Sequence, residues 1–285
     1  MKIIKTVAEM MSLSANLPSS RCVVPTMGAL HEGHISLLNI ANKSDLLIAT
    51  LFVNPLQFNN KSDFLKYPNT LNEDVDIFAK NNVDILFMPA KEDILNFNLY
   101  KEIDSGDAGN LWEGKYREGH FNGVLTIVDI IFQILKPSKA VFGMKDFQQL
   151  CLIFSYFSSK HSVEIIPVET QRNKDGLAYS SRNRLLSDSS IKRASIINRG
   201  LLKAKKIWAE DKDINNVKSQ LKIILQTETK LNIEYIQINP LKELEETIGK
   251  GSFDNLFKED TSRWQVLLVA GYIDDVRLID NIILR

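Results

Sequence analysis

Apolar runs alternate with helix-like segments through the first 170 residues of the chain. The runs with strand character span 23–26, 46–53, 83–88, 140–142 and 163–168. The segments with helical spacing of apolar residues span 34–43, 71–81, 124–135 and 145–158. Because strands that alternate with helices build parallel sheets, we predict an α/β fold, with a Rossmann-like, doubly wound parallel sheet over residues 1–170.

The pattern changes after about residue 170. Two amphipathic helices are predicted first and short strands follow them, the helices at 189–212 and 217–230 and the strands at 233–238, 265–270 and 276–279. We therefore predict a smaller α+β domain over 171–285. The polar junction 171–187 contains the turn-prone Lys174-Asp175-Gly176. Ligand crevices often form at such boundaries, so we expect this domain to close over a ligand.

The composition excludes several classes of partner. Of 285 residues, 44% are hydrophobic, which is enough for a substantial core. Lys plus Arg and Asp plus Glu both number 35, so no overall positive field favours nucleic acid or an anionic membrane surface. An anionic ligand must therefore be held by local groups.

Two further features bear on location. Cys22 and Cys151 lie in apolar runs without the spacing of zinc ligands, so we expect buried thiols. No apolar run approaches the roughly 18 residues of a spanning helix, and the first residues lack the apolar segment of a signal peptide. We expect a cytoplasmic location.

The strongest chemical signal is PTMGALHEGH at residues 25–34, between the first predicted strand and the first predicted helix. A helix N-terminus presents unpaired N–H groups, Gly28 and Gly33 permit close approach of a ligand, and His31 and His34 can reach one phosphate. These features suit the triphosphate of ATP. The alternative is an ordinary turn with two solvated histidines. Zinc is disfavoured, because the HExxH pattern needs one more residue between the histidines.

Further motifs extend this signal. An HxGH motif at this point is the signature of nucleotidyltransferases related to class I aminoacyl-tRNA synthetases. The chain also carries, in order, FVNPLQF at 52–58, GHFNGV at 119–124, FGMKDFQQL at 142–150, KDGLAYSSRN at 174–183 and RLIDN at 277–281. Nearly the whole chain therefore resembles the pantothenate synthetase (pantoate–β-alanine ligase) family.

The resemblance implies a reaction. This family joins (R)-pantoate to β-alanine while ATP is cleaved to AMP and pyrophosphate, with Mg²⁺ and a bound pantoyl adenylate. His34 resembles the catalytic histidine and His31 a second contact to the nucleotide, both as hydrogen-bond donors and not as proton carriers. Lys145 and Arg182 resemble the catalytic cations at the phosphates, although either residue alone more often forms a surface salt bridge. A homodimer is expected by resemblance only.

The resemblance also implies two binding sites. The residues expected at ATP are Met27, Gly28, His31, His34, Gly143, Lys145, Asp146, Tyr179, Ser180, Ser181 and Arg182. Asp146 has helix capping as its alternative. Gln57 and Gln149, whose amides both donate and accept, are expected at pantoate, with Met27 and Phe58 as apolar wall. Core packing is the rival interpretation for Met27 and Phe58, and solvation for the glutamines.

The remaining expectations concern a metal and a lid. Asp74 resembles an acidic position for Mg²⁺, with Glu73 beside it, although both can simply lie on a helix surface. Residues 59–73 are a hypothetical lid, in which Asn69 stands where relatives have arginine. A second departure is YREG at 116–119, where an arginine-proline-glycine run is expected.

Three other functions are possible for a chain with these motifs. A non-catalytic nucleotide-binding protein would have lost polar groups that this chain keeps. A nucleotidyltransferase making a dinucleotide-type product would lack the paired glutamines and FGMKDFQQL. A tRNA synthetase would need more chain and a basic surface. We therefore favour the ligase.

Overall fold

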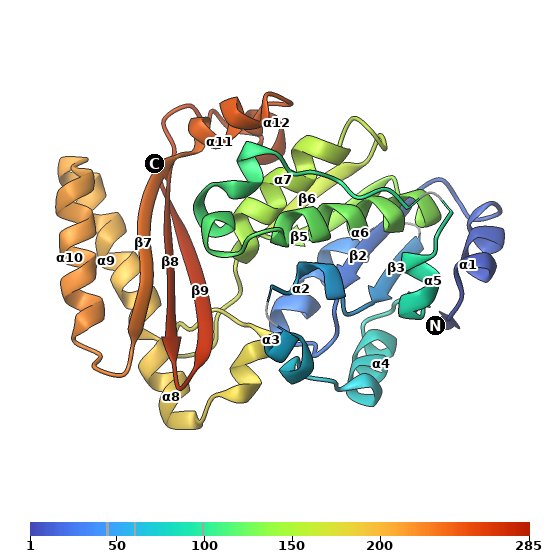
Figure 1. Ribbon diagram of the computed structural model, residues 1–285, viewed down its shortest axis with the longest axis horizontal. Helices are drawn as coiled ribbons and strands as arrows, with labels where there is room; N and C mark the ends of the chain where they lie inside the picture. Colours follow the sequence, from blue (N-terminus) through green and yellow to red (C-terminus); the bar gives the residue numbers. More distant parts are fainter. Residues whose placement is uncertain (44–45, 60, 99) are drawn as a thin grey trace.

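The computed structural model describes residues 1–43, 46–59, 61–98 and 100–285. Among these residues, six parallel strands form one sheet in the order β1-β4-β3-β2-β5-β6 (Figure 1). They are β1 (Lys2–Ile4), β2 (Arg21–Thr26), β3 (Leu46–Leu51), β4 (Ile85–Phe87), β5 (Lys139–Gly143) and β6 (Glu164–Val168). Because the strands add outward on both sides of β2, the predicted doubly wound sheet is confirmed.

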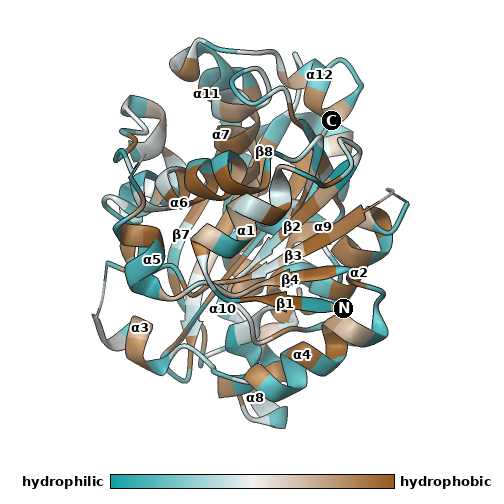
Figure 2. Cartoon of the chain, turned by 90° about the vertical axis from the view of Figure 1, so that its right-hand side faces the viewer, coloured by the Kyte–Doolittle hydropathy of each residue, from teal (hydrophilic) through white to brown (hydrophobic). Residues whose placement is uncertain are grey.

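Helices cover both faces of this sheet. One face carries α1 (Val7–Ser14), α6 (His120–Leu135) and α7 (Phe147–Phe157), and the other carries α2 (Glu32–Ala41) and α4 (Leu71–Lys80). Successive strand residues alternate between the two cores: Val23 packs with the first group, Cys22 and Val24 with the second. The central strands are accordingly hydrophobic along their length (Figure 2).

The sheet opens between β2 and β5. These strands pair only at Cys22 with Lys139 and at Val23 with Ala140, although β2 continues to Thr26 and β5 to Gly143. Strand order reverses at this point, so the connections after the two strands leave in different directions. Ligands of doubly wound sheets bind in such a crevice, at the carboxyl ends of the strands.

The C-terminal part is a three-stranded antiparallel sheet with helices, among the residues described. Its strands, in the order β7-β8-β9, are β7 (Asn232–Pro240), β8 (Gln265–Ile273) and β9 (Val276–Leu284). Its helices are α8 (Asp188–Ala194), α9 (Ile196–Asp211), α10 (Ile214–Gln226), α11 (Leu241–Ile248) and α12 (Phe253–Phe257). The helix predicted at 189–212 is divided at Ser195. The predicted smaller α+β unit is confirmed.

The small sheet lies between two cores (Figure 1). On one face, Leu267 and Val269 pack with α9 and α10. On the other, Val266 and Leu268 join the large core that contains α6 and α7. The C-terminal sheet is therefore packed directly against the body that carries the crevice.

Some elements were not predicted. The edge strand β1 has three residues, too few to show alternation, and α1 follows it with Thr6 accepting a hydrogen bond from the backbone N–H of Glu9. Helices α3 (Lys61–Lys66) and α5 (Lys91–Leu95) are similarly short. Residue 60 of the predicted lid lies outside the described residues. No helix in the described ranges is long and apolar enough to cross a membrane.

Candidate active site

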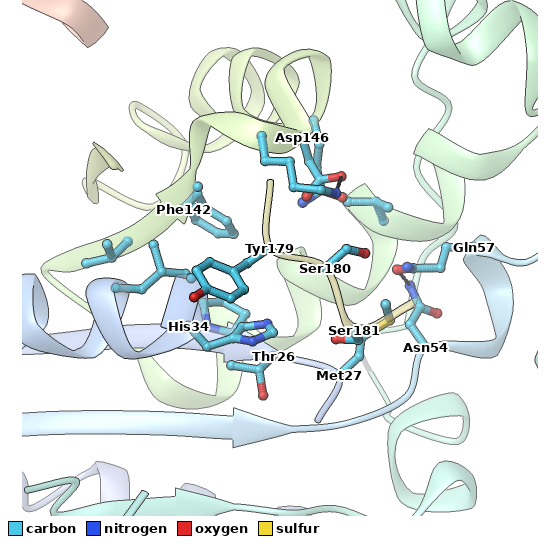
Figure 3. A pocket seen from close by; sticks show the side chains of 18 of the residues that line it. Thr26, Met27, His34, Asn54, Gln57, Phe142, Asp146, Tyr179, Ser180 and Ser181 are labelled. Carbon is cyan, nitrogen blue, oxygen red and sulfur yellow. Dashed lines mark hydrogen bonds and ion pairs between the residues drawn. The ribbon is translucent and has the colours of Figure 1, made fainter. Parts of the chain in front are cut away.

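A cavity of about 230 Å³ lies at the opening between β2 and β5 (Figure 3). The predicted residues that line it are Met27, His31, His34, Gln57, Gly143, Lys145, Asp146, Gln149, Tyr179, Ser180, Ser181 and Arg182. Gly28 and Asp74 stand behind the turn that forms one wall. The structure thus brings together groups from separate sequence motifs.

The two histidines form the N-terminal cap of α2. The backbone N–H of Gly33 donates to Nδ1 of His31 at 3.1 Å, and the backbone N–H of His31 donates to Nδ1 of His34 at 3.3 Å. Both Nδ1 atoms therefore act as acceptors, which leaves the proton of each neutral ring on Nε2. A Cβ on Gly33 would lie 2.8 Å from Cε1 of His31, so a larger residue here would displace the His31 ring.

Both histidines are neutral at physiological pH. Burial lowers the pKa of His31 to about 2, and the nearby ammonium of Lys145 and ring of His34 also oppose its protonation. Burial lowers the pKa of His34 to about 4, against the opposing effect of Asp74. Each ring is therefore a neutral N–H donor, and the positive charge of the cavity must come from other side chains.

Asp74 holds the turn from behind. Its carboxylate accepts the backbone N–H of Ala29 at 2.9 Å and that of Leu30 at 2.8 Å, and Oγ1 of Thr70 donates to it at 3.2 Å. The side chain is buried, with a residue exposure of 1%. Asp74 was predicted as a magnesium ligand. In the structure, both of its carboxylate oxygens instead accept hydrogen bonds from the turn and from Thr70. Gly28, with φ of +81° and no side chain, permits the close approach of the Asp74 carboxylate.

Lys145 and Asp146 follow β5 in the short 3-10 helix η4 (Met144–Asp146), immediately before α7. Lys145 Nζ lies 3.8 Å from Oδ1 of Asp146, whose side chain is 48% exposed. Asp146 makes no side-chain cap bond to α7. Helix capping, the alternative interpretation of Asp146, therefore does not describe this carboxylate, which faces the cavity.

Arg182 already has an anionic partner. Its Nη2 donates to Oδ2 of Asp63 at 2.8 Å and its Nε to Oδ1 at 3.4 Å, which ties the 3-10 helix η5 (Ser181–Leu185) to α3. The Ser181 hydroxyl donates to the carbonyl of Ala29 at 3.0 Å. The Ser180 hydroxyl accepts the backbone N–H of Arg182. The SSRN segment is therefore linked both to the histidine turn and to the predicted lid.

The two glutamines of FGMKDFQQL behave differently. Gln148 is buried and donates at 2.9 Å to the carbonyls of both Ala108 and Leu111, so it fastens a loop. Gln149 lines the cavity. On another element of the lining, Oε1 of Gln57 accepts from Nδ2 of Asn54 at 3.1 Å. The cavity therefore presents two glutamine amides from different elements.

The cavity residues that were not predicted from the sequence include Asn54, Tyr67, Arg117 and His120. His120 Nδ1 lies 2.8 Å from the carbonyl of Gln57, and its Nε2 lies 2.9 Å from Nη1 of Arg117. Burial lowers the pKa of Arg117 to about 10, so its guanidinium remains charged at neutral pH. Asn54 lies in the FVNPLQF motif and His120 in the GHFNGV motif, so these motifs could have indicated both residues. Arg117 falls in the departing YREG run.

An apolar wall is present, with a different composition from that expected. Phe52, Val124 and Val128 line the cavity beside Met27. Phe58 does not belong to this lining. Its ring instead contacts those of Phe64 and Tyr67, at centroid distances of 5.3 and 5.8 Å. Packing, the rival interpretation of Phe58, therefore describes this ring, which contacts the segment that carries α3.

No group of three or more potential metal-binding side chains occurs within the described part of the chain. A divalent cation here would need ligands from a phosphate. Asp146 is an exposed carboxylate of the cavity, whereas Glu73 pairs with Arg184 at 2.9 Å. The site suits a cation that arrives with a nucleotide, because Mg²⁺ commonly takes one or two carboxylates together with phosphate oxygens.

Comparisons with known proteins agree with this geometry. Residues 2–283 match the pantoate-beta-alanine ligase family. The chain belongs to this family. It is similar to the pantothenate synthetase of Carboxydothermus hydrogenoformans, with 37% identity over 92% of this chain and 90% of that protein. Membership of this family confirms the predicted ligase and disfavours the alternative functions.

Solved structures show the same fold. The pantothenate synthetase of Thermus thermophilus has a TM-score of 0.84 at 33% identity, over 99% of each chain. The pantoate-beta-alanine ligase of Francisella tularensis, complexed with beta-gamma ATP and beta-alanine, has a TM-score of 0.76 at 33% identity. It covers 99% of this chain and 97% of that one. The pantoate-beta-alanine ligase fold therefore extends over both parts of the molecule.

Proposed function

We propose that this chain condenses (R)-pantoate with β-alanine, with cleavage of ATP to AMP and pyrophosphate, in pantothenate biosynthesis. One observation carries the proposal: a single cavity joins two neutral imidazoles, the cation Lys145 and the amides of Gln57 and Gln149. The first three groups suit phosphates and the amides suit a hydroxy acid. Family membership over residues 2–283 supports the same reaction.

The first step forms the acyl adenylate. A pantoate carboxylate oxygen bonds to the α-phosphorus, and the bond from that phosphorus to the bridging oxygen breaks to release pyrophosphate. Negative charge grows on the phosphates, where Nε2–H of His31 and of His34 donates hydrogen bonds and Lys145 supplies positive charge. Proton transfer by the histidines is unnecessary, since the attacking carboxylate carries no proton.

The second step forms the amide. The neutral amine of β-alanine attacks the acyl carbon, the bond from that carbon to the AMP oxygen breaks, and the proton lost by the nitrogen passes to water. Gln57 and Gln149 hold the pantoyl hydroxyls while Phe52 and Val124 contact its methyl groups, so the acyl carbon keeps one orientation. The apolar wall also keeps water from the adenylate.

Several finer assignments belong to the same proposal. Arg182, with Ser180, Ser181, Tyr179 and Gly143, binds the nucleotide. Asp146 would hold Mg²⁺ beside the phosphates, where the ion supplies charge neutralisation. Residues 171–285 act as the domain that closes over ATP, and 59–73 as the lid. A homodimer and a cytoplasmic location stay predictions, which sedimentation and cell fractionation would test.

The deciding experiment measures AMP release from ATP and Mg²⁺ with both organic substrates and with each omitted. We expect AMP only when pantoate and β-alanine are both present, and a loss of at least about a hundredfold in kcat for His34→Ala. Turnover that ignores pantoate would contradict the proposed substrate. An equally active His34→Ala protein would contradict the proposed site.

A matched control uses a histidine outside the cavity. His161 follows the end of α7, where its Nε2 contacts Oδ1 of Asp129 at 2.6 Å, and it does not line the cavity. The His161→Gln protein should therefore retain most of its AMP release. Equal losses for both histidine variants would show that the His34 effect is general instability.

A further inference from the structure

Asn281 connects the C-terminal sheet to the segment that carries Lys145. It lies on β9, and its side-chain amide donates to the carbonyl of Met144 at 3.0 Å and to that of Lys145 at 2.8 Å. Asn281 is buried, with 6% of the residue exposed. One amide nitrogen therefore serves consecutive carbonyls of η4.

The hydrogen bonds to these two carbonyls fix the backbone direction at Lys145. The 3-10 helix η4 has only three residues and joins the end of β5 to the start of α7. A segment of this length makes few hydrogen bonds of its own, so its direction depends on outside partners. The Asn281 amide supplies two of them. The Lys145 side chain extends from this anchored backbone, and only 19% of that side chain is exposed.

The donor itself is held rigidly. The backbone of Asn281 pairs with Leu268 within the antiparallel sheet, and its N–H also contacts Oδ1 of Asp280 at 2.8 Å. Asp280 in turn receives two hydrogen bonds from the guanidinium of Arg172, at 2.5 and 2.9 Å. Arg172 lies in the segment between the two parts of the molecule. A series of contacts from Arg172 through Asp280 and Asn281 thus ends at Lys145.

We propose that Asn281 is a positioning residue for Lys145, through which the C-terminal sheet sets the place of the phosphate-binding cation. This inference rests on the proposed function, because it takes ATP phosphates as the ligand of Lys145. Asn281 itself does not line the main cavity. Its effect on the reaction therefore passes through the backbone of η4.

A purely structural role makes a different prediction. If Asn281 only fastened the two parts together, its loss would weaken the fold and lower ATP affinity whether or not Lys145 were present. If it positions Lys145, its loss matters only while the ammonium group exists. A double-mutant cycle separates the two possibilities, because coupled residues give non-additive effects.

The experiment measures ATP affinity by calorimetry for the wild type, Asn281→Ser, Lys145→Met and the double variant. Serine keeps one donor and a small side chain, so it is the milder change; Asn281→Leu, which removes both donors, is the stronger one. We expect Asn281→Ser to weaken ATP binding about tenfold in the wild type. In the Lys145→Met background the same change should alter affinity less than about twofold.

A control removes another bond between the two parts. Nε1 of Trp112 donates to Oε2 of Glu243 at 3.4 Å, and Glu243 does not line the cavity. Glu243→Ala should leave ATP affinity within about twofold of the wild type. Equal weakening by Asn281→Ser in both Lys145 backgrounds would overturn the inference. Absence of ATP binding by the wild type would instead overturn the proposed function.

Discussion

Two walls of the same cavity are built in different ways. The histidine turn is held by backbone hydrogen bonds, by the buried carboxylate of Asp74 and by the cap of α2. Another part of the wall carries Arg182, which forms an ion pair with Asp63; their side chains are 25% and 41% exposed. An exposed pair of this kind contributes only about 0–1 kcal/mol. One wall is therefore preformed, whereas the other can exchange a carboxylate for a phosphate.

The two parts of the wall also differ in their charge before ATP binds. The ring centroids of His31 and His34 lie 4.1 Å apart. Because both rings are neutral, they do not repel each other, and their turn needs no ligand to hold it. Arg182 and Lys145 each lie beside a carboxylate, Asp63 and Asp146 respectively. A polyanion that enters the cavity competes with those carboxylates. Preorganised donors and exchangeable cations together suit a substrate whose charge changes during reaction.

The largest expected effect comes from removing the support of the preformed wall. Asp74→Ala leaves the buried N–H groups of Ala29 and Leu30 without their acceptor, which should lower the free energy of unfolding by about 2–5 kcal/mol. Urea denaturation without Mg²⁺ checks this, and kcat should fall at least about a hundredfold. Unchanged stability with activity restored by excess Mg²⁺ would return Asp74 to its predicted role as a metal ligand.

A smaller change tests the cap alone. In Gly33→Ala, the new Cβ would lie 2.8 and 2.9 Å from Cε1 and Nδ1 of His31, so that ring must move. We expect kcat to fall about tenfold, with a loss of stability of about 1 kcal/mol. Steady-state kinetics and thermal unfolding measure the two effects. Wild-type kinetics in this variant would mean that the position of His31 is unimportant.

The exchangeable wall should respond in the opposite direction. Asp63→Asn removes the carboxylate that competes for Arg182, so ATP should bind about two- to fivefold more tightly, with little change in stability. Glu73→Gln is the matched control, because it breaks a comparable pair with Arg184, 2.9 Å long, outside the cavity lining. Weaker ATP binding by Asp63→Asn would indicate that Asp63 supports the site.

The smallest expected effect is the absence of histidine titration near neutral pH. Ring ¹⁵N chemical shifts should show His31 and His34 as neutral Nε2–H tautomers from about pH 8 down to about 5.5. Because the folded pKa of His34, about 4, lies below its usual value of 6.5, this group's contribution to stability is full above 6.5. That contribution is lost as the pH falls toward 4. Protonation of either ring near its usual pKa of 6.5 would contradict the neutral-donor account.

The sequence predicted the fold where periodicity was strong. Alternating apolar runs predicted β2 to β6, since these strands are largely buried, whereas β1 was too short to leave a pattern. The division of the helix at 189–212 was also missed, because Ser195 is an ordinary residue in a helical pattern. Fold class therefore followed from long segments, and errors gathered at short ones.

Motifs predicted the residues that line the site but not the residues that hold them in place. Motif resemblance selected Gln149 as a pantoate contact, and Gln149 lines the cavity, yet nothing in the local sequence distinguishes it from the buried Gln148. Asp74 was noticed as acidic, but its bonds to Ala29 and Leu30 join residues far apart in the chain. Asn281 likewise acts on residues 136 and 137 positions away. Such long-range contacts have no local signature.

The most direct test of the account is isotope exchange between pyrophosphate and ATP. A two-step reaction predicts exchange that requires pantoate and Mg²⁺ but not β-alanine, because the adenylate forms before the amine attacks. Lys145→Met should abolish the exchange. Exchange that proceeds without pantoate, or that appears only when β-alanine is added, would contradict a pantoyl adenylate formed at this cavity.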